Sequence, residues 1–248
     1  LVLRPGGNGA LIENLNDLNA DILLVRNIDN VVPDARKQAN LHWTRLLTGY
    51  LLEIQEEQHA LLKALQNQPD DAMVRELAIS FLADRLQTDV SLSSDNKALI
   101  KTLDRPIRVC GMVPNSGEPG GGPFWVRNDQ GRMTKQIVEA AQIDKSDPEQ
   151  AAILSQSTHF NPVDMVCAVR NWQGRPYDLT RFVDDNAVIV TTKHQGKREI
   201  RVLELPGLWN GGMAGWRIEP GPHRAEVHGH DVHVGGHRRH PAIRLVSP

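Results

Sequence analysis

The stretch that decides the fold is GGNGALIENLNDLNADILLVRNIDNVVPD, residues 6–34. It places a glycine-rich turn before an amphipathic segment, followed by a compact apolar run from Ile22 to Val25 that ends in polar residues. Such a run is typical of a buried parallel strand that ends in a loop. Ligands bind outside the carboxyl ends of strands in open α/β sheets. We therefore expect a binding site where NIDN, residues 27–30, follows the strand.

The turn before the amphipathic segment consists of Gly6, Gly7, Asn8 and Gly9. Glycine allows backbone angles closed to other residues and lets a ligand approach the main chain, and free N–H groups at the start of a helix attract anions. The turn could therefore bind a ligand. An ordinary loop is the alternative, because a single glycine-rich turn is weakly diagnostic.

The rest of the chain alternates between helical and strand-like patterns. Apolar residues at three- and four-residue steps predict helices over residues 34–66, 70–87, 94–103 and 148–156, the second of them capped by Asp70 or Asp71. Strands are predicted within residues 107–113, 131–144 and 160–169, and a hairpin within residues 187–207 that turns at Gln195 and Gly196. This alternation predicts a layered α/β domain with a hairpin appended.

The composition favours a protein that binds small ligands. The chain has 248 residues, a formal net charge of -2 and a pI near 6.6, so it lacks the field that holds nucleic acid or an acidic membrane. No apolar run reaches the length of a membrane span. Cys110 and Cys167 stand far apart without a CxxC motif, so neither a disulfide framework nor a cysteine zinc site is indicated. We expect a cytoplasmic protein.

The composition changes sharply at residue 217. Residues 217–248 contain six of the ten histidines but no Phe, Tyr, Trp, Met or Lys. The motif HGHDVH could hold zinc or nickel, since alternate residues of a strand share a face. A disordered or artefactual end is the alternative that we favour, because nothing apolar anchors it and Pro and Gly punctuate it. We therefore expect a domain over residues 1–216 and a separate tail.

Four polar clusters stand at predicted loops or strand ends, at residues 6–15, 27–30, 115–123 and 158–164. Together they suggest a cleft lined by backbone amides and small polar side chains. Asp29 and Glu118 are the carboxylates placed to hold a divalent cation, and Mg²⁺ commonly uses one or two carboxylates plus substrate phosphates. An Asx turn or helix cap is the alternative for Asp29, and an exposed loop charge is the alternative for Glu118.

Two further polar residues stand out. Glu139 falls within a strand-like run, where it either faces solvent or is held by a ligand or a cation. His159 lies two residues before Asn161 and is a candidate ligand contact, although a structural histidine is the commoner case. The chain has no GxSxG nucleophile motif, which argues against hydrolysis through an acyl enzyme.

Taken in order, these clusters resemble the nucleotidyltransferases that make UDP-sugars from UTP and a sugar 1-phosphate. The matching stretches are GNGALIENL (7–15), NIDN (27–30), KQIVEAAQI (135–143) and STHFNPVD (157–164). The run from Leu3 to about Trp216 more closely resembles a bacterial family known as domain of unknown function 4301. The stretches that carry this second match are residues 4–34, CGMVPNSGEPGGGPFWV (110–126), THFNPVDMVCAV (158–169) and LELPGLWNGGMAGW (203–216).

The transferase resemblance implies roles for residues of these stretches. It implies that the glycine turn meets the nucleobase, that Asp29 binds the metal or the sugar phosphate, and that Glu139 and Asn161 hold sugar hydroxyls. Within the same polar clusters, we expect further substrate contacts from Asn30, Glu118, Gly120, Gly121 and His159.

The implied fold is a Rossmann-like α/β domain of the GT-A, nucleotidyltransferase-like type, with a mixed sheet flanked by helices. The implied reaction transfers a nucleotidyl group from a nucleoside triphosphate to a sugar 1-phosphate and releases pyrophosphate, with Mg²⁺ as cofactor. A non-catalytic nucleotide or sugar-phosphate binding protein is the alternative, and a metal-handling protein that uses the tail is a second one.

The sequence departs from the transferase pattern in places. Ala10 replaces the second glycine of the base-binding pair, and Ala140 and Ala141 replace the Tyr-Ser of the sugar-binding strand. The phosphate-cradling loop with its arginine and lysine has no counterpart, and the histidine-rich tail replaces expected apolar strands. We therefore expect an incomplete domain that is catalytically poor alone.

Overall fold

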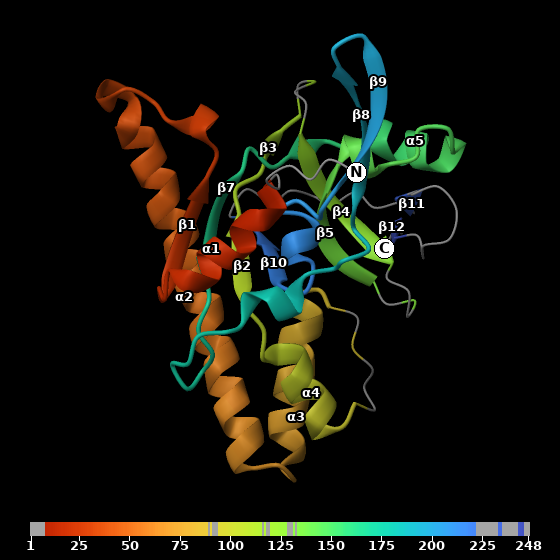
Figure 1. Cartoon of the computed structure of the whole chain (residues 1–248). Helices are drawn as coiled ribbons and strands as arrows, with labels where there is room; N and C mark the ends of the chain where they lie inside the picture. Colours follow the sequence, from red (N-terminus) through yellow and green to blue (C-terminus); the bar gives the residue numbers. More distant parts are fainter. Residues whose placement is uncertain are drawn as a thin grey trace.

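The computed structural model describes residues 8–88, 90, 94–115, 117, 120–127, 131, 133–221, 233–234 and 243–245. Within them, helices pack on both faces of a mixed sheet, and a second sheet stands beside the first (Figure 1). The chain is therefore a mixed α/β protein, which confirms the fold class predicted from the alternation of strands and helices.

The helices are α1 (Leu11–Asp17), α2 (Lys37–Asn67), α3 (Ala72–Ser80), α4 (Asn96–Leu103) and α5 (Pro148–Ser155). Single turns of 3-10 helix are η1 (Asn8–Ala10), η2 (Ile28–Asn30), η3 (Asp34–Arg36), η5 (Ala140–Gln142), η6 (Leu179–Phe182) and η7 (Gly211–Met213), and η4 (Phe81–Arg85) is π-helical. The strands are β1 (Ile22–Arg26), β2 (Ile107–Cys110), β3 (Val113–Pro114), β4 (Gly121–Arg127), β5 (Met133–Glu139), β6 (His159–Phe160), β7 (Asp164–Ala168), β8 (Ile189–Gln195), β9 (Arg198–Glu204), β10 (Arg217–Pro220), β11 (His233–Val234) and β12 (Ile243–Leu245).

The first sheet has the strand order β1-β7-β2-β10, in which β2 and β10 are parallel and the other neighbours are antiparallel. The expectation of a buried parallel strand at Ile22 to Val25 is therefore wrong, because β1 is an edge strand paired antiparallel with β7. The apolar residues of β1 are explained instead by packing on both faces of the strand. Leu23 packs into the core on one face and Ile22 against the core on the other, while Leu24 is 62% exposed.

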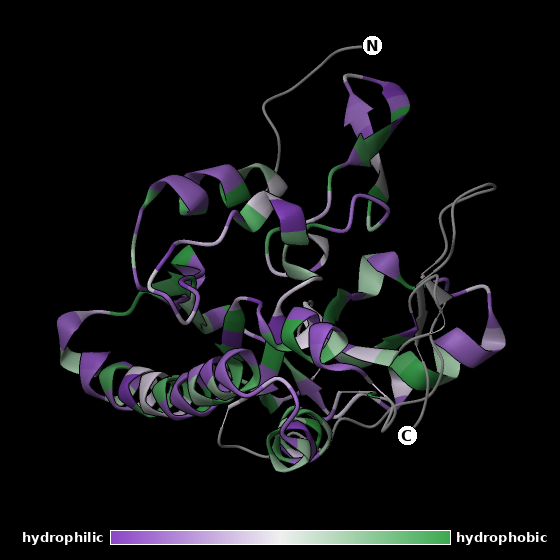
Figure 2. Cartoon of the chain, turned by 90° about the horizontal axis from the view of Figure 1, so that it is seen from below, coloured by the Kyte–Doolittle hydropathy of each residue, from purple (hydrophilic) through white to green (hydrophobic). Residues whose placement is uncertain are grey.

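Helix α2 covers one face of this sheet, across β2 and β7 (Figure 1). It confirms the helix predicted over residues 34–66, and its buried residues include Leu47, Leu51 and Ile54. Figure 2 shows the hydrophobic colour on the central strands, while hydrophilic and hydrophobic residues alternate along the long helix α2. In the part of the chain that the structure describes, none of the helices combines the length and apolarity needed to cross a membrane.

The other predicted helices are confirmed with shorter bounds. The segment 70–87 forms α3, whose N-cap is Asp71, and continues into the turn η4. The segments 94–103 and 148–156 form α4 and α5. The aspartate side chains at all three N-caps accept hydrogen bonds from main-chain N–H groups, which satisfies donors that a helix start leaves open.

Helix α1 and the turn η7 cover the opposite face of the first sheet. Their apolar residues pack with Met165, Cys110 and Cys167, and both cysteines are buried and free. Burial raises the pKa of the Cys110 thiol to about 11. Both cysteines therefore act as small apolar residues of the core, as predicted for Cys167.

The second sheet has the order β11-β12-β4-β5, with β4 and β5 antiparallel from Gly121 opposite Glu139 to Arg127 opposite Met133. Helix α5 packs on one face of it. The predicted hairpin is confirmed as β8 and β9, which project from the molecule (Figure 1). Its turn is Gly196-Lys197 rather than Gln195-Gly196, because Gln195 still pairs with Arg198.

The predicted tail begins where β10 begins, and β10 is a member of the first sheet. Two short pieces of the tail join the second sheet: β12 pairs with β4, and β11 pairs with β12. Of the HGHDVH histidines proposed for zinc or nickel, His228 and His230 lie outside the described residues, and His233 belongs to β11. The other tail histidines, His223, His237 and His240, also lie outside the described residues.

A buried ion pair joins the two sheets. Lys135 Nζ of β5 donates to Glu219 Oε1 of β10 at 3.0 Å, and the two side chains are 6% and 5% exposed. Burial lowers the pKa of Lys135 and raises the pKa of Glu219, and each partner opposes the shift of the other. The pair therefore fixes how β10 lies against β5, and loss of one partner leaves a buried charge.

Replacing Glu219 with glutamine should lower the free energy of unfolding by about 3 kcal/mol, because Lys135 keeps a buried charge without a carboxylate. Urea denaturation of both proteins measures the difference. Glu204→Gln is the matched control, since its partner Lys193 is 55% exposed and exposed pairs contribute about 0–1 kcal/mol. Equal losses in the two variants would contradict this account.

Candidate functional site

Asn161 lies at the junction between β6 and the second sheet. Its main-chain N–H donates to Gly121 O at 2.8 Å, and its Nδ2 donates to Gly111 O at 2.7 Å. Its Oδ1 accepts from the main-chain N–H of Val163 at 3.1 Å, where the backbone has a φ of 59°. The side chain is thus buried, with the residue 3% exposed, and it links three segments that are far apart in the sequence.

Asn30 brings the segment after β1 to the same junction. Its Nδ2 donates to Pro162 O at 2.5 Å and to Val163 O at 3.3 Å. The main-chain N–H of Asn27 also donates to Val163 O, at 3.0 Å. NIDN and THFNPVD, two of the four polar clusters, therefore lie in direct contact.

Glu139 ends β5 opposite Gly121 and is held by protein donors. Its carboxylate accepts from the main-chain N–H of Gln142, while its own N–H donates to Gln142 Oε1 at 2.9 Å. Asn210 Nδ2 donates to Glu139 Oε1 at 3.1 Å, and Trp209 also donates to the carboxylate. Burial raises the pKa of Glu139, and these side-chain donors oppose the rise.

The loop of residues 206–213 connects Glu139 to the glycine turn. A Cβ on Gly9 would lie 2.1 Å from Pro206 O, so only glycine fits there. Asn210, in the same loop, donates to Gln142 Oε1 at 3.0 Å as well as to Glu139. Chain packing alone therefore accounts for the glycine at position 9, and its contact with a nucleobase stays a prediction.

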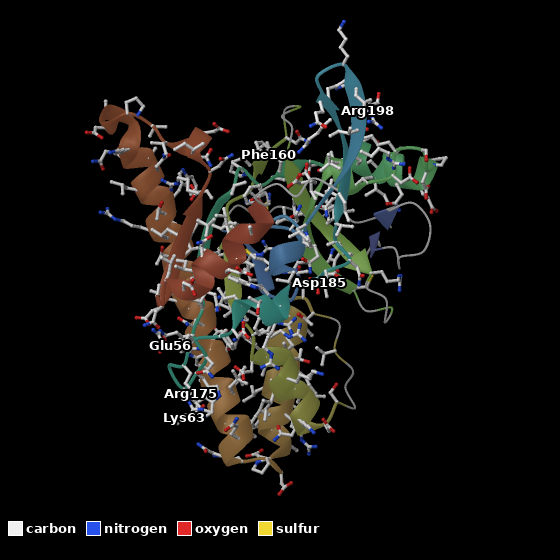
Figure 3. The ribbon with its side chains drawn as sticks, viewed as in Figure 1. Glu56, Lys63, Phe160, Arg175, Asp185 and Arg198 are labelled. Atoms are coloured by element: carbon white, nitrogen blue, oxygen red, sulfur yellow. The ribbon has the colours of Figure 1, made fainter. Side chains whose placement is uncertain are left out.

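The other described candidates lie near this junction with fewer contacts. Asp29 is exposed in η2, where Asn27 Nδ2 donates to its Oδ2 at 3.3 Å. The His159 Nδ1 shares a hydrogen bond with the neighbouring Thr158 hydroxyl at 2.9 Å. Gly120 is exposed, and a Cβ there would lie 3.5 Å from Phe160 Cδ2. Figure 3 labels Phe160, which lies near β3 on the same side of the molecule as the projecting hairpin.

The structure thus brings some candidates together and leaves others apart. Direct contacts connect the segments of Asn30, Gly121, Glu139 and Asn161, and Gly9 reaches them through Pro206. Asn8 begins η1. Gly6, Gly7 and Glu118 lie outside the described residues.

Asp29 is the candidate ligand for Mg²⁺. Among the residues that the structure describes, no group of three or more His, Cys, Asp and Glu side chains could hold a metal ion. A single exposed carboxylate fits an ion that takes its other ligands from phosphate oxygens and water. The donor set therefore suits Mg²⁺ that arrives with a phosphate substrate, rather than a permanently bound ion.

A cavity of about 1320 Å³ opens between α4, β5 and η6. Gln142 and Asn210 line it, together with charged residues that include Arg181 and Asp185, the second of which is labelled in Figure 3. None of the residues Asn30, Gly121, Glu139 and Asn161 lines this cavity. The predicted substrate residues therefore form a separate junction of loops.

A family model described as domain of unknown function (DUF4301) matches residues 1–218. The chain belongs to this family. The resemblance seen in stretches such as LELPGLWNGGMAGW is thereby confirmed. Neither the curated proteins nor the solved structures contain a match to the chain. No relative of known activity therefore bears on the resemblance to UDP-sugar pyrophosphorylases.

Sequence reasoning missed Trp209, Asn210 and Gln142 as members of this junction. Asn210 stands 71 residues from Glu139 in the chain, and Asn-Gly-Gly is an ordinary turn pattern. The available signal was the stretch LWNGGMAGW itself, which carries the family resemblance. The sequence does not show what the Asn210 side chain contacts, because Glu139 and Gln142 are distant from it in the chain.

Asn210→Ala should lower the free energy of unfolding by about 1–3 kcal/mol, because Glu139 and Gln142 lose a donor and stay partly or fully buried. Denaturant titration measures the loss. Asn186→Ala is the control: Asn186 is exposed, and its loss should stay within about 0.5 kcal/mol. A loss at Asn210 as small as that of the control would show that the network contributes little.

The raised pKa of Glu139 should make stability depend on pH. The unfolded group titrates near 4.5, so its contribution is fully present below that pH and is lost as pH rises through the higher folded pKa. The stability of the natural chain minus that of Glu139→Gln should therefore fall as pH rises above about 4.5. Urea titrations at several pH values measure it, with Glu149→Gln on α5 as control. A constant difference would refute the shift.

Proposed function

We propose that this chain binds a nucleoside triphosphate and a sugar 1-phosphate, and that it takes part in a nucleotidyl-transfer reaction that releases pyrophosphate. One observation carries the proposal. Asn30 bonds to the main chain beside Asn161, Asn161 bonds to Gly121, and Gly121 pairs with Glu139. The stretches that resemble the transferases in sequence are thus neighbours in space.

The finer fold that we propose is the Rossmann-like, GT-A type of these enzymes. Support comes from the first sheet, in which NIDN follows the carboxyl end of β1 and helices cover both faces. Helix α1 and β1 run in opposite directions, so η1, which precedes α1, and NIDN, which follows β1, lie toward the same edge of that sheet (Figure 1). This is the edge at which ligands bind in open α/β sheets.

The chemistry is an in-line attack. An oxygen of the sugar 1-phosphate forms a bond to the α-phosphorus, the bond between that phosphorus and the β-phosphate oxygen breaks, and pyrophosphate leaves. Mg²⁺ at Asp29 would neutralise phosphate charge. A carboxylate has about four acceptor positions, and Gln142, Asn210 and Trp209 donate to that of Glu139. Protein donors thus orient Glu139 and leave it room for one sugar hydroxyl.

The second candidate is a binding protein that does not catalyse the transfer. It is favoured by the single carboxylate at Asp29 and by the lack, among the described residues, of a larger group of metal ligands. Such a protein would keep the substrate contacts and leave pyrophosphate in place.

Calorimetry of the chain with UTP, a sugar 1-phosphate and a UDP-sugar, each with and without Mg²⁺, tests binding. An assay for pyrophosphate separates the enzyme from the binder. Asp29→Asn should weaken the Mg²⁺-dependent part of nucleotide binding by about tenfold or more, because the exposed carboxylate is a direct ligand.

Asp17→Asn, at the exposed end of α1, is the matched control and should bind as the natural chain does. Binding without pyrophosphate release would support the second candidate. Failure of every nucleotide and sugar phosphate to bind would refute both, and unchanged binding by Asp29→Asn would remove the proposed metal ligand.

A further inference from the structure

Arg108 is a buried cation without an acidic partner among the described residues. The residue lies on β2 with 0% exposure, in the core that α1 and η7 cover. Its Nη1 donates to Trp209 O and approaches Met213 Sδ at 3.4 Å and Met165 Sδ at 4.0 Å. Burial lowers the pKa of Arg108, and only the thiols of two neighbouring cysteines oppose the shift. A buried charge in such surroundings costs several kcal/mol unless an anion compensates it.

The nitrogen atoms of Arg108 that lack a partner within the described structure are Nε and Nη2. These two atoms share one edge of the guanidinium, the edge that donates two parallel hydrogen bonds to a carboxylate or a phosphate. The Trp209 carbonyl oxygen already accepts a hydrogen bond from Nη1. An oxyanion on the free edge would therefore not displace the loop.

Trp216 provides a second, independent observation. It is 4% exposed, and its Nε1 has no acceptor among the described residues. It packs in the same core as Met213, whose sulfur contacts Arg108, and it directly precedes Arg217, which pairs with Ile107 beside Arg108. Buried polar groups are normally hydrogen-bonded. The orphaned groups of Arg108 and Trp216 are N–H donors, so the partner that these two side chains lack is an acceptor.

We propose that Arg108 and Trp216 bind a small oxyanion, of the class of phosphate, sulfate or a carboxylate, in the core beneath α1. Two of its oxygen atoms accept from Nε and Nη2 of Arg108, and one accepts from Nε1 of Trp216. Met165 and Met213 have flexible side chains that can repack around it. A water molecule would satisfy a donor but would leave the charge of the guanidinium uncompensated.

This site is distinct from the proposed nucleotide site, since it uses neither Asp29 nor Glu139. The bound anion also compensates the buried charge of Arg108. With the anion in place, the guanidinium has partners on both edges, and its bond to Trp209 O holds the loop of residues 206–213.

The test is thermal unfolding of the whole chain, refolded from urea into chloride buffer so that no oxyanion is carried over. Phosphate, sulfate and formate are then added at constant ionic strength. With a dissociation constant of about 1 mM, about 50 mM phosphate should raise Tm by about 5 °C. A response to formate alone would identify a carboxylate as the occupant. No response to any of the three anions would overturn the proposal.

Arg108→Met should abolish the response and, without added anion, should unfold at a Tm no lower than that of the natural chain, because an uncompensated buried charge is gone. Arg175→Met is the matched control, on the exposed loop beside α2 (Figure 3), and should respond in full. An unchanged response in Arg108→Met would place the anion elsewhere and would overturn the proposal.

Trp216→Phe keeps an aromatic ring and removes only the N–H donor, so it tests the site if Arg108→Met fails to fold. Equilibrium dialysis with labelled phosphate should find one phosphate per natural chain and an affinity at least about threefold lower in Trp216→Phe. Equal affinity in both proteins, together with a normal response of Arg175→Met, would exclude Trp216 from the site.

Discussion

The loop of residues 206–213 is the constraint on which the arrangement of the molecule depends. It reaches η1, directly before α1, through Pro206, the interior of the first sheet through the Trp209 carbonyl, and the end of β5 through Asn210. Gly212 N donates to Gly207 O at 2.8 Å, which closes the loop on itself. Because one short segment makes all these contacts, the start of α1, the core and the end of the second sheet cannot shift independently. The candidate residues around Glu139 are therefore held by the tertiary structure, although each stands in a loop or at a strand end.

Two of the buried cationic side chains, Lys135 and Arg108, differ in how their charge is compensated. Lys135 meets Glu219 at 3.0 Å, so its charge is compensated and the pair fixes β10 against β5. Arg108 meets a carbonyl oxygen and sulfur atoms instead. A carbonyl oxygen is a good acceptor but carries no net charge, and sulfur is a weak acceptor. The charge of Lys135 is compensated by a carboxylate of the same chain, whereas the charge of Arg108 requires an anion that the described residues do not supply. That contrast separates a structural ion pair from a binding site.

The helices could be predicted from the sequence because their signal is local: apolar spacing identifies α2, and an aspartate cap marks the start of α3. The neighbours of β1 could not be predicted, because strand pairing depends on segments more than a hundred residues away. Glu139 illustrates the same limit, since the pattern marked it as costly to bury without showing that Asn210 would hold it. Arg108 stands between Ile107 and Val109, and such alternation of polar and apolar residues is typical of a strand with one face exposed to solvent. Only the folded chain shows that α1 and η7 cover that face as well.

Trp209 and Asn210 are neighbours in one loop, and they contact Arg108 and Glu139, the residues of the two proposed sites. Trp209 accepts from Arg108 through its carbonyl, and the next residue holds the carboxylate of Glu139. If an oxyanion binds Arg108 more tightly when the loop is in place, its binding free energy favours the conformation in which Glu139 is oriented. By reciprocity, a ligand that uses the oriented Glu139 must strengthen oxyanion binding by the same factor. An ordered interior anion and an ordered substrate contact are then two consequences of one loop conformation, and neither requires a change elsewhere in the fold.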